Sequence, residues 1–201
     1  MENNIQIGLF FNRDHYFDTV LLAGKFKAKV PDLGDGVVIP YNGESNAPLI
    51  IFDNSIQVKL LVFANHVLIT LPVNQELFFK KNLKAIINVL EKEKIALTRI
   101  GYLKTITLGE QESVLFRNNA FDDNEILHAD EYQVSYYKLI KINELNVNCW
   151  KKYLTDKNKF TISFDLNTLM EEEQNIDYDF VISFMKDSDH YIEQNQIANL
   201  F

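Results

Sequence analysis

Two charged residues and a tyrosine interrupt apolar stretches of the sequence, and they are the first candidates for a chemical role. Arg99 and Tyr102 stand in "ALTRIGYLKTITLG", and Asp165 stands in "KFTISFDL". A half-buried guanidinium needs a carboxylate partner or an anionic ligand, because an unpaired buried charge is costly. The sequence leaves two interpretations open. Arg99 and Asp165 form an internal ion pair, or Arg99 and Tyr102 form a ligand site together with the loop at 34–43.

That loop belongs to a connection rich in glycine and proline, "PDLGDGVVIPYNGESNAP", with room for a short strand at 37–39. Loops of this length in compact domains are often functional. The stretch "GDGVV" has neither the lysine nor the following helix of a phosphate-binding loop, and the sequence contains no Gly-x-Ser-x-Gly elbow. The sequence therefore predicts no cofactor and no catalytic residue of a standard type.

Histidine and cysteine do not occur at the spacings of known metal or nucleophile sites. No two histidines lie within one helical turn or at alternate strand positions; they are His15, His66, His128 and His190. No metal motif is predicted, although acids beside two histidines, in "HADE" and "DSDH", leave a spatially assembled centre open. The single cysteine, Cys149, excludes an intrachain disulfide. Strand alternation places Cys149 and Trp150 on opposite faces of an expected strand. Because free cysteine is among the most often buried residue types, the thiol is predicted to be buried and unreactive.

Tyrosines and acids supply candidates for an interface. Tyr132 and Tyr136 share one face of an expected strand and Tyr137 the other, which fits core packing, a protein interface or an apolar pocket. The acidic run "EEEQNIDYD" is expected to be a solvated loop in which Asp177 caps a terminal helix. Together with "FDDNE" at 121–125, it could instead meet a basic partner or mimic nucleic-acid charge. Its first residues are Glu171, Glu172 and Glu173.

Composition and charge narrow the class of protein. The chain has 201 residues, 47% of them hydrophobic, which is enough for a substantial core. A net charge of −8 disfavours direct binding to nucleic acid, which requires Lys and Arg to displace counterions. The apolar run at the N-terminus follows an acid and is short, and no run approaches a membrane span. A cytoplasmic protein is expected, and an oligomer is left open.

The N-terminal elements that must position the candidate residues can be assigned from their patterns. An apolar strand at 5–11 precedes a helix expected to begin at Asn12 or Asp14 and to end at Pro31. Three short apolar runs between 48 and 73 then predict an antiparallel meander.

A helix at 75–94 follows the first meander, with an apolar stripe at Leu83, Ile86, Ile87 and Leu90, and a strand at 96–109 follows that helix. A second meander from 132 to 166, with its first turn at Asn143 and Glu144, leads to a C-terminal helix. These two meander-then-helix units, after an N-terminal strand and helix, predict an α+β fold with antiparallel sheet. A single domain over 1–201 is expected. Whether 1–109 and 110–201 are similar halves is left open, because only the order of elements repeats.

One strand and the elements around it resemble a known family. The strand carries Arg99, Ile100 and Gly101, and the chain later has "FTISFDLNT" before an amphipathic terminal helix. Together with an early helix that stops at a proline, this is similar to a sporadically distributed family of uncharacterised bacterial proteins. In that family the Arg-Ile-Gly strand usually continues with Leu-Arg-Tyr and an asparagine, whereas this chain reads Tyr102, Leu103 and Lys104. The resemblance implies bacterial or phage origin, a one-domain α+β fold and no particular activity.

Three functions remain in view. The first is a noncatalytic protein-interaction module of bacterial or phage origin, in a defence or counter-defence setting, whose partner is another protein. The second is a small-ligand-binding or enzymatic domain with a site around Arg99 and the loop at 34–43. The third is an acidic nucleic-acid mimic that acts as an inhibitor.

Overall fold

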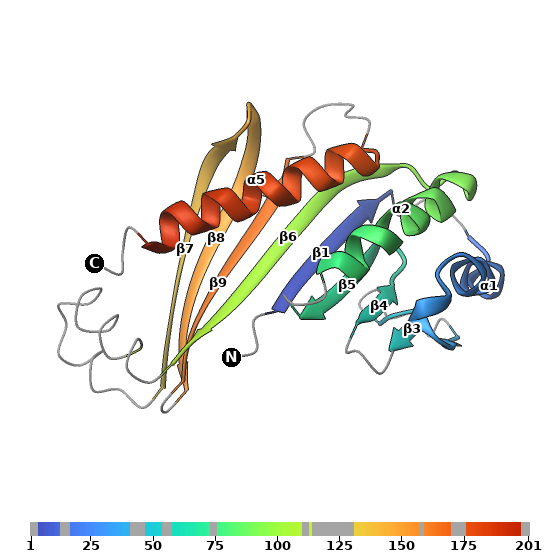
Figure 1. Ribbon diagram of the computed structural model, residues 1–201, viewed down its shortest axis with the longest axis horizontal. Helices are drawn as coiled ribbons and strands as arrows, with labels where there is room; N and C mark the ends of the chain where they lie inside the picture. The colour runs from blue at the N-terminus through green and yellow to red at the C-terminus, as the bar shows by residue number, and fades with distance from the viewer. Residues whose placement is uncertain are drawn as a thin grey trace.

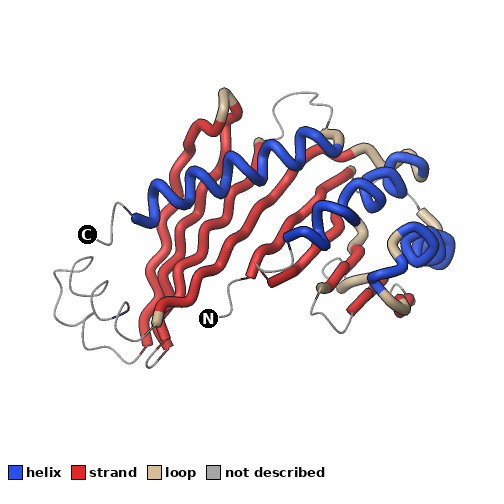
Figure 2. Tube along the Cα trace, in the orientation of Figure 1, coloured by secondary structure: helices blue, strands red, loops and turns tan. Residues whose placement is uncertain are grey.

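One antiparallel sheet of nine strands organises the chain, in the order β2-β3-β4-β5-β1-β6-β9-β8-β7 (Figures 1 and 2). The computed structural model describes residues 4–12, 17–40, 47–53, 58–72, 76–109, 113, 131–156, 159–169 and 176–197. The strands are β1 (Asn4–Phe11), β2 (Gly36–Val38), β3 (Ile50–Asp53), β4 (Lys59–Val62), β5 (His66–Pro72), β6 (Leu97–Leu108), β7 (Glu131–Ile142), β8 (Leu145–Asp156) and β9 (Lys159–Thr168). The expected α+β class with an antiparallel sheet is confirmed.

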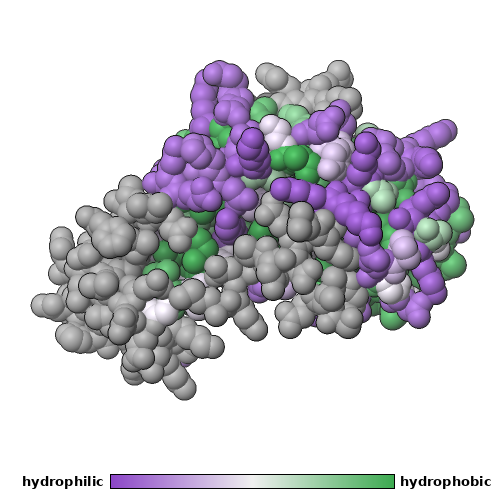
Figure 3. Space-filling view, viewed as in Figure 1, coloured by the Kyte–Doolittle hydropathy of each residue, from purple (hydrophilic) through white to green (hydrophobic). Residues whose placement is uncertain are grey.

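Three helices lie on one face of this sheet (Figures 1 and 2). They are α1 (Thr19–Lys29), α2 (Glu76–Lys92) and α5 (Tyr178–Ile197), and a short 3-10 turn, η1 (Pro31–Leu33), follows α1. Viewed from that side, hydrophilic side chains gather over the outer surface of α5 (Figure 3). No described helix covers the opposite face of the sheet, which we call the uncovered face.

The core lies between the helices and the sheet because each element is apolar on the side it turns inward. The expected stripe on α2 is buried, and α5 buries a stripe of its own. At the other end of the sheet, the ring of Phe26 on α1 packs edge-on against Phe52 on β3, with centroids 6.2 Å apart. The buried stripes are Leu83, Ile86, Ile87 and Leu90 on α2, and Val181, Phe184, Met185 and Ile192 on α5.

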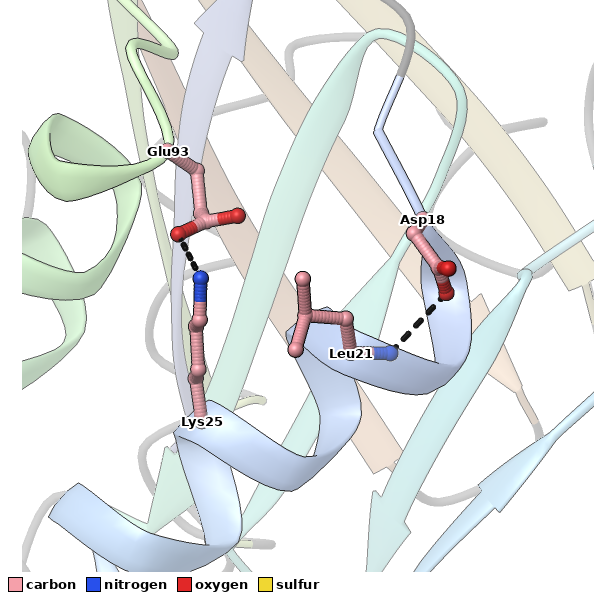
Figure 4. Close-up of polar contacts among 4 residues, drawn as sticks. All are labelled: Asp18, Leu21, Lys25 and Glu93. Carbon is pink, nitrogen blue, oxygen red and sulfur yellow. Dashed lines mark hydrogen bonds and ion pairs between the residues drawn. The ribbon is translucent and has the colours of Figure 1, made fainter.

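Helix α1 begins later than the sequence pattern predicted. Its N-cap is Asp18, whose carboxylate accepts hydrogen bonds from the backbone N–H groups of Val20 and Leu21 at 2.9 and 3.0 Å (Figure 4). The expected caps Asn12 and Asp14 were wrong, because Asp18 directly precedes the first helical residue and satisfies the orphan N–H groups there. On the next turns, Lys25 pairs with Glu93 and joins α1 to the end of α2 (Figure 4).

Other local predictions hold. Asp177 caps α5 by accepting from the N–H of Phe180 at 2.9 Å. Asn143 and Glu144 connect β7 to β8 with φ angles of 44° and 68°, as a two-residue primed hairpin turn requires. That turn aligns β7 with β8 from end to end, since every residue from Glu131 to Ile142 has a partner.

Candidate functional site

Strand alternation divides the candidate residues on β6 between the two faces of the sheet. Tyr102 is completely buried under α5, where its hydroxyl donates to a carboxylate oxygen of Asp189 at 2.7 Å. The Lys104 ammonium donates to the same oxygen at 2.6 Å. Arg99 is three residues from Tyr102 and therefore points to the uncovered face. The two residues therefore do not share a site. The alternation of side chains along a strand would already have predicted this from the sequence.

Arg99 and Asp165 both belong to the uncovered face but do not form an ion pair. The register of β6 with β9 places Asp165 opposite Leu103, four residues along the strand from Arg99. Both side chains are described, and no ion pair joins them. The residue opposite Arg99 on the other neighbouring strand is Phe10, and the guanidinium carbon lies 4.0 Å from the centre of its ring. The Arg99 Nε is buried and has no hydrogen-bond partner among the described residues.

The ring of Phe10 lies over two glycines that face each other at the centre of the sheet. Gly8 on β1 is directly opposite Gly101 on β6. A Cβ atom at Gly8 would lie 2.7 Å from the Phe10 ring, and one at Gly101 would lie 3.3 Å from it and 2.6 Å from the Asn167 amide oxygen. The glycines therefore leave the space that the ring occupies, which is a known role of glycine inside strands.

Two further rings extend this contact across the sheet. His66 on β5 stacks on Phe10 with centroids 5.2 Å apart, and Phe63 stacks on His66 at 4.2 Å. We call Phe63, His66, Phe10 and Arg99 the central ladder. Sequence reasoning missed it because its members come from segments about 90 residues apart in the chain. The signal present in the sequence was a glycine inside each of two apolar strands.

Partial burial shifts the pKa values of the titratable groups around the central ladder. Burial lowers the pKa of His66, and the nearby Arg99 charge lowers it further, so the imidazole is neutral at pH 7. Its Nδ1 donates to the Asn65 amide oxygen at 2.9 Å, which is the only direction an amide oxygen allows. Burial raises the pKa of Asp165, whereas a hydrogen bond from the Asn167 amide, at 2.6 Å, opposes that shift. Arg99 is thus the cation of the central ladder.

A second cluster lies on the uncovered face of β7 and β8. Tyr137 and Trp150 face each other with ring centroids 5.0 Å apart, and Leu139 is diagonal to Trp150. Their side chains are 52%, 47% and 56% exposed, in that order. The Tyr137 hydroxyl donates to the Asn148 amide oxygen at 2.6 Å, which holds the ring in place. We call Tyr137, Leu139 and Trp150 the aromatic patch.

The remaining interface candidates are distributed differently. Tyr136 points to the helix side of β7, is 49% exposed, and packs edge-on against Tyr153 at 5.5 Å. The backbone of Tyr132 pairs with Thr155. The acids Glu171, Glu172 and Glu173 lie outside the described residues, as does the stretch at 121–125. The charge-mimic hypothesis therefore stays a prediction.

The glycine-rich loop is far from Arg99. Its described part, 34–40, includes β2 at one edge of the sheet, five strand positions from β6. Adjacent strands are about 4.8 Å apart, so the loop and Arg99 are separated by roughly 24 Å. The structure does not bring these two parts of the expected ligand site together, because β3, β4, β5 and β1 lie between them.

Chemistry on the helix side is limited by burial. Cys149 is fully buried beneath α5, and this burial raises the pKa of its thiol. Trp150 points the other way, as predicted. Within the described ranges, no three His, Cys, Asp or Glu side chains gather closely enough to hold a metal ion. A hollow between α2 and β6 is lined by aliphatic side chains together with two charged residues, Glu91 and Lys94, and no candidate residue lines it; its aliphatic walls include Ile87, Leu90, Ile95, Leu97 and Ile176.

Comparison with known proteins does not extend these observations. None of the described helices is both long and apolar enough to cross a membrane. The sequence matches no protein-family model and no curated protein.

Proposed function

We propose that this protein is a noncatalytic binding module that docks another protein on the uncovered face of its sheet. The observation that carries the proposal is the aromatic patch. Trp150, Tyr137 and Leu139 are each about half exposed, and the three helices in the described part of the chain lie on the other side of the sheet. Large apolar side chains that gather on a surface mark contact sites more often than isolated ones do.

The residue types on this face match those that contribute most to protein interfaces. Trp, Tyr and Arg are enriched among residues whose removal weakens binding strongly. Here Trp150 and Tyr137 would supply the apolar anchor, and Arg99 would supply a cation for an acidic side chain of the partner. Phe10 holds that guanidinium in position before binding, so less side-chain entropy is lost on contact.

The cellular setting is part of the proposal. The resemblance of the Arg-Ile-Gly strand to a family of bacterial proteins supports bacterial or phage origin, and its sporadic distribution would suit defence or counter-defence. A net charge of −8 favours a protein partner over nucleic acid. We place the protein in the cytoplasm, where its single cysteine would stay reduced.

We also infer that the domain contains two similar halves, 1–109 and 110–201, each with a meander followed by a helix. Supporting this, each half contributes a run of three adjacent antiparallel strands to the sheet, β3–β5 in the first half and β7–β9 in the second. The two halves meet where β6 pairs with β9. Strands β3–β5 precede α2, and β7–β9 precede α5.

A second function is favoured by one observation: the Nε of Arg99 has no hydrogen-bond partner within the described ranges. A small anion such as a carboxylate or a phosphate could bind this guanidinium directly. Titration with acetate and with inorganic phosphate, followed by thermal unfolding, distinguishes the two functions. A saturable stabilisation that Arg99→Gln abolishes would support the anion site.

The proposed function is tested by affinity capture from a lysate of cells that encode the protein. The bait is compared with Trp150→Ser and Tyr137→Ser, which remove the aromatic patch without touching the core. The matched control is Val20→Ser on α1, because Val20 is 68% exposed and lies away from the sheet face. Partners are quantified by mass spectrometry.

We expect one protein to be captured in stoichiometric amount by the wild type and by Val20→Ser, and to be lost from both patch variants. Capture that is equal for all four baits would contradict the proposal. Circular dichroism of each bait establishes that the sheet is intact. Direct titration of the purified partner then gives the change in Kd.

A further inference from the structure

Strand β7 is a long strand at the open edge of the sheet. Among the described residues its strand neighbour is β8, which pairs with all twelve residues from Glu131 to Ile142. An edge strand directs alternate N–H and C=O groups outward, where they can pair with another strand. No bulge interrupts this register, and the opposite edge strand, β2, has only three residues. The sheet therefore presents one edge suited to extension.

Three large side chains of β7 are also exposed. Tyr136, Tyr137 and Leu139 are 49%, 52% and 56% exposed. Monomeric proteins usually blunt such edges by shortening, bulging or covering them. Among the described residues, β7 is neither short, bulged nor covered along its outer edge, so a strand from another chain would complete the edge.

We propose that the occupant is β7 of a second copy, which pairs antiparallel and joins two sheets into one. In such a pair the two-fold axis is perpendicular to the sheet, and opposed residues lie on the same face. Opposed residues therefore have numbers that are both odd or both even, and the two residue numbers add to the same even sum in every pair. Only two such registers overlap eleven of the twelve residues; they are centred on Tyr136 and on Tyr137.

Charge selects between these registers. With the axis at Tyr136, Glu131 lies opposite Lys141 of the second copy, and the same pair recurs at the other end. With the axis at Tyr137, Lys141 lies opposite Gln133 instead. Both charged side chains are exposed, and opposite charges placed across two strands stabilise the pairing. Strand β7 is thus complementary to itself in the register centred on Tyr136.

This register also assigns the exposed tyrosines. Tyr136 meets its own copy at the axis, beside the Tyr153 ring on which it already packs. Because the axis is perpendicular to the sheet, the uncovered faces of both copies lie on the same side. The two aromatic patches then flank the axis on one surface. The dimer does not depend on the proposed protein partner.

The experiment is a measurement of the dimer dissociation constant of the full chain by sedimentation and light scattering, with charge variants. Glu131→Lys and Lys141→Glu each place like charges opposite each other twice, and each is expected to weaken the dimer about tenfold or more. The double variant Glu131→Lys with Lys141→Glu restores opposite charges and should return the constant close to that of the wild type. Glu144→Lys in the hairpin turn changes the charge equally outside the paired range.

A disulfide trap tests the register itself. Tyr136→Cys is expected to give a covalent dimer on mild oxidation, since each Tyr136 faces its own copy. Gln133→Cys is the control, because Gln133 would face Leu139 and form no symmetric bond. The buried Cys149 is replaced by serine in both variants.

Two results would overturn the proposal. One is a chain that stays at its monomer mass of 23.4 kDa at the highest soluble concentration. The other is a dimer that the single charge variants leave unchanged and that Gln133→Cys traps as readily as Tyr136→Cys. Circular dichroism of every variant excludes loss of fold as the cause.

Discussion

The guanidinium carbon of Arg99 lies 4.0 Å from the centre of the Phe10 ring, and that ring covers the facing glycines Gly8 and Gly101. This relationship links the centre of the fold to the uncovered face. The glycines admit the ring, and the ring positions the guanidinium. Substitutions at the glycines therefore test the packing, and substitutions at Arg99 test its proposed role in binding.

Replacing either glycine by alanine should destabilise the protein. A Cβ at Gly8 would meet the Phe10 ring at 2.7 Å, and one at Gly101 would meet the Asn167 amide oxygen at 2.6 Å. We expect each variant to lose about 1–3 kcal/mol of unfolding free energy, as overpacked sites do. Urea denaturation measures the change.

The control for this prediction is Gly24→Ala on α1, where an added Cβ meets nothing within 4 Å. That variant should gain about 0.5–1 kcal/mol, because alanine favours the helix over glycine. In a Phe10→Leu background, the loss from Gly8→Ala should shrink, since the obstructing ring is gone. Fully additive losses would show that the ring is not the obstacle.

Arg99→Ala should affect binding more than folding. The guanidinium contacts an aromatic face and has no ion-pair partner among the described residues, so its removal should cost about 1 kcal/mol of stability. Binding of the captured partner should fall by about 2 kcal/mol or more, as at interface residues that dominate affinity. Lys59→Ala is the control, since Lys59 is an exposed cation paired with Asp53 at 2.8 Å. Equal binding by Arg99→Ala and Lys59→Ala would show that Arg99 is not part of the interface.

Tyr102 and Asp189 should contribute to stability alone. Tyr102→Phe removes the 2.7 Å hydrogen bond to Asp189, and we expect a loss of about 1–2 kcal/mol. Asp189→Ala removes the acceptor shared by Tyr102 and Lys104 and should cost more, about 2–4 kcal/mol. The control is Asp187→Ala, because Asp187 is on the same helix but only accepts a hydrogen bond from the exposed Ser183, at 3.2 Å; the expected change is below about 0.5 kcal/mol. Thermal and urea unfolding of the three variants, alongside partner binding, separate this role from the binding role of Arg99.

Lys151 should make stability depend on pH in the alkaline range. Burial, together with the charge of Lys138, lowers the pKa of Lys151 from 10.5 to about 8. Below pH 8 the amine is charged in both the folded and the unfolded chain, so the folded state bears the full cost of burying it. Between about pH 8 and 10.5 the unfolded chain binds more protons, and stability rises with pH.

Lys151→Met should therefore raise the unfolding free energy at pH 7 by about 1–2 kcal/mol, because methionine fills the space without a charge. This gain should shrink as the pH approaches 10.5. Urea denaturation of the wild type and of Lys151→Met at several pH values measures the difference in unfolding free energy. Lys152→Met, on the exposed side of the same strand, should show no such pH dependence. A gain independent of pH would assign the effect to packing.

Much of this fold could be predicted from local sequence patterns. Apolar stripes at three and four residues located the buried sides of α2 and α5, and alternation placed Cys149 inside and Trp150 outside. The hairpin turn at Asn143 and Glu144 was also visible. These features depend on helical period, strand period and turn conformation, which involve residues close together in the chain.

Strand order and register depended on contacts between distant segments. Phe10 pairs with His66 on one side and with Arg99 on the other, and no local pattern specifies either neighbour. The register of β6 with β9 separates Arg99 from Asp165, and the strand order separates Arg99 from the described part of the loop, 34–40. It also leaves β7 at the edge. The sequence could therefore identify Arg99, Tyr102 and the tyrosines of β7 as candidates, and the strand period could assign each to a face of the sheet. Only the assembled sheet showed that Arg99 lies beside Phe10 and not beside Asp165, and that β7 lies at an edge, because both depend on pairing between distant segments.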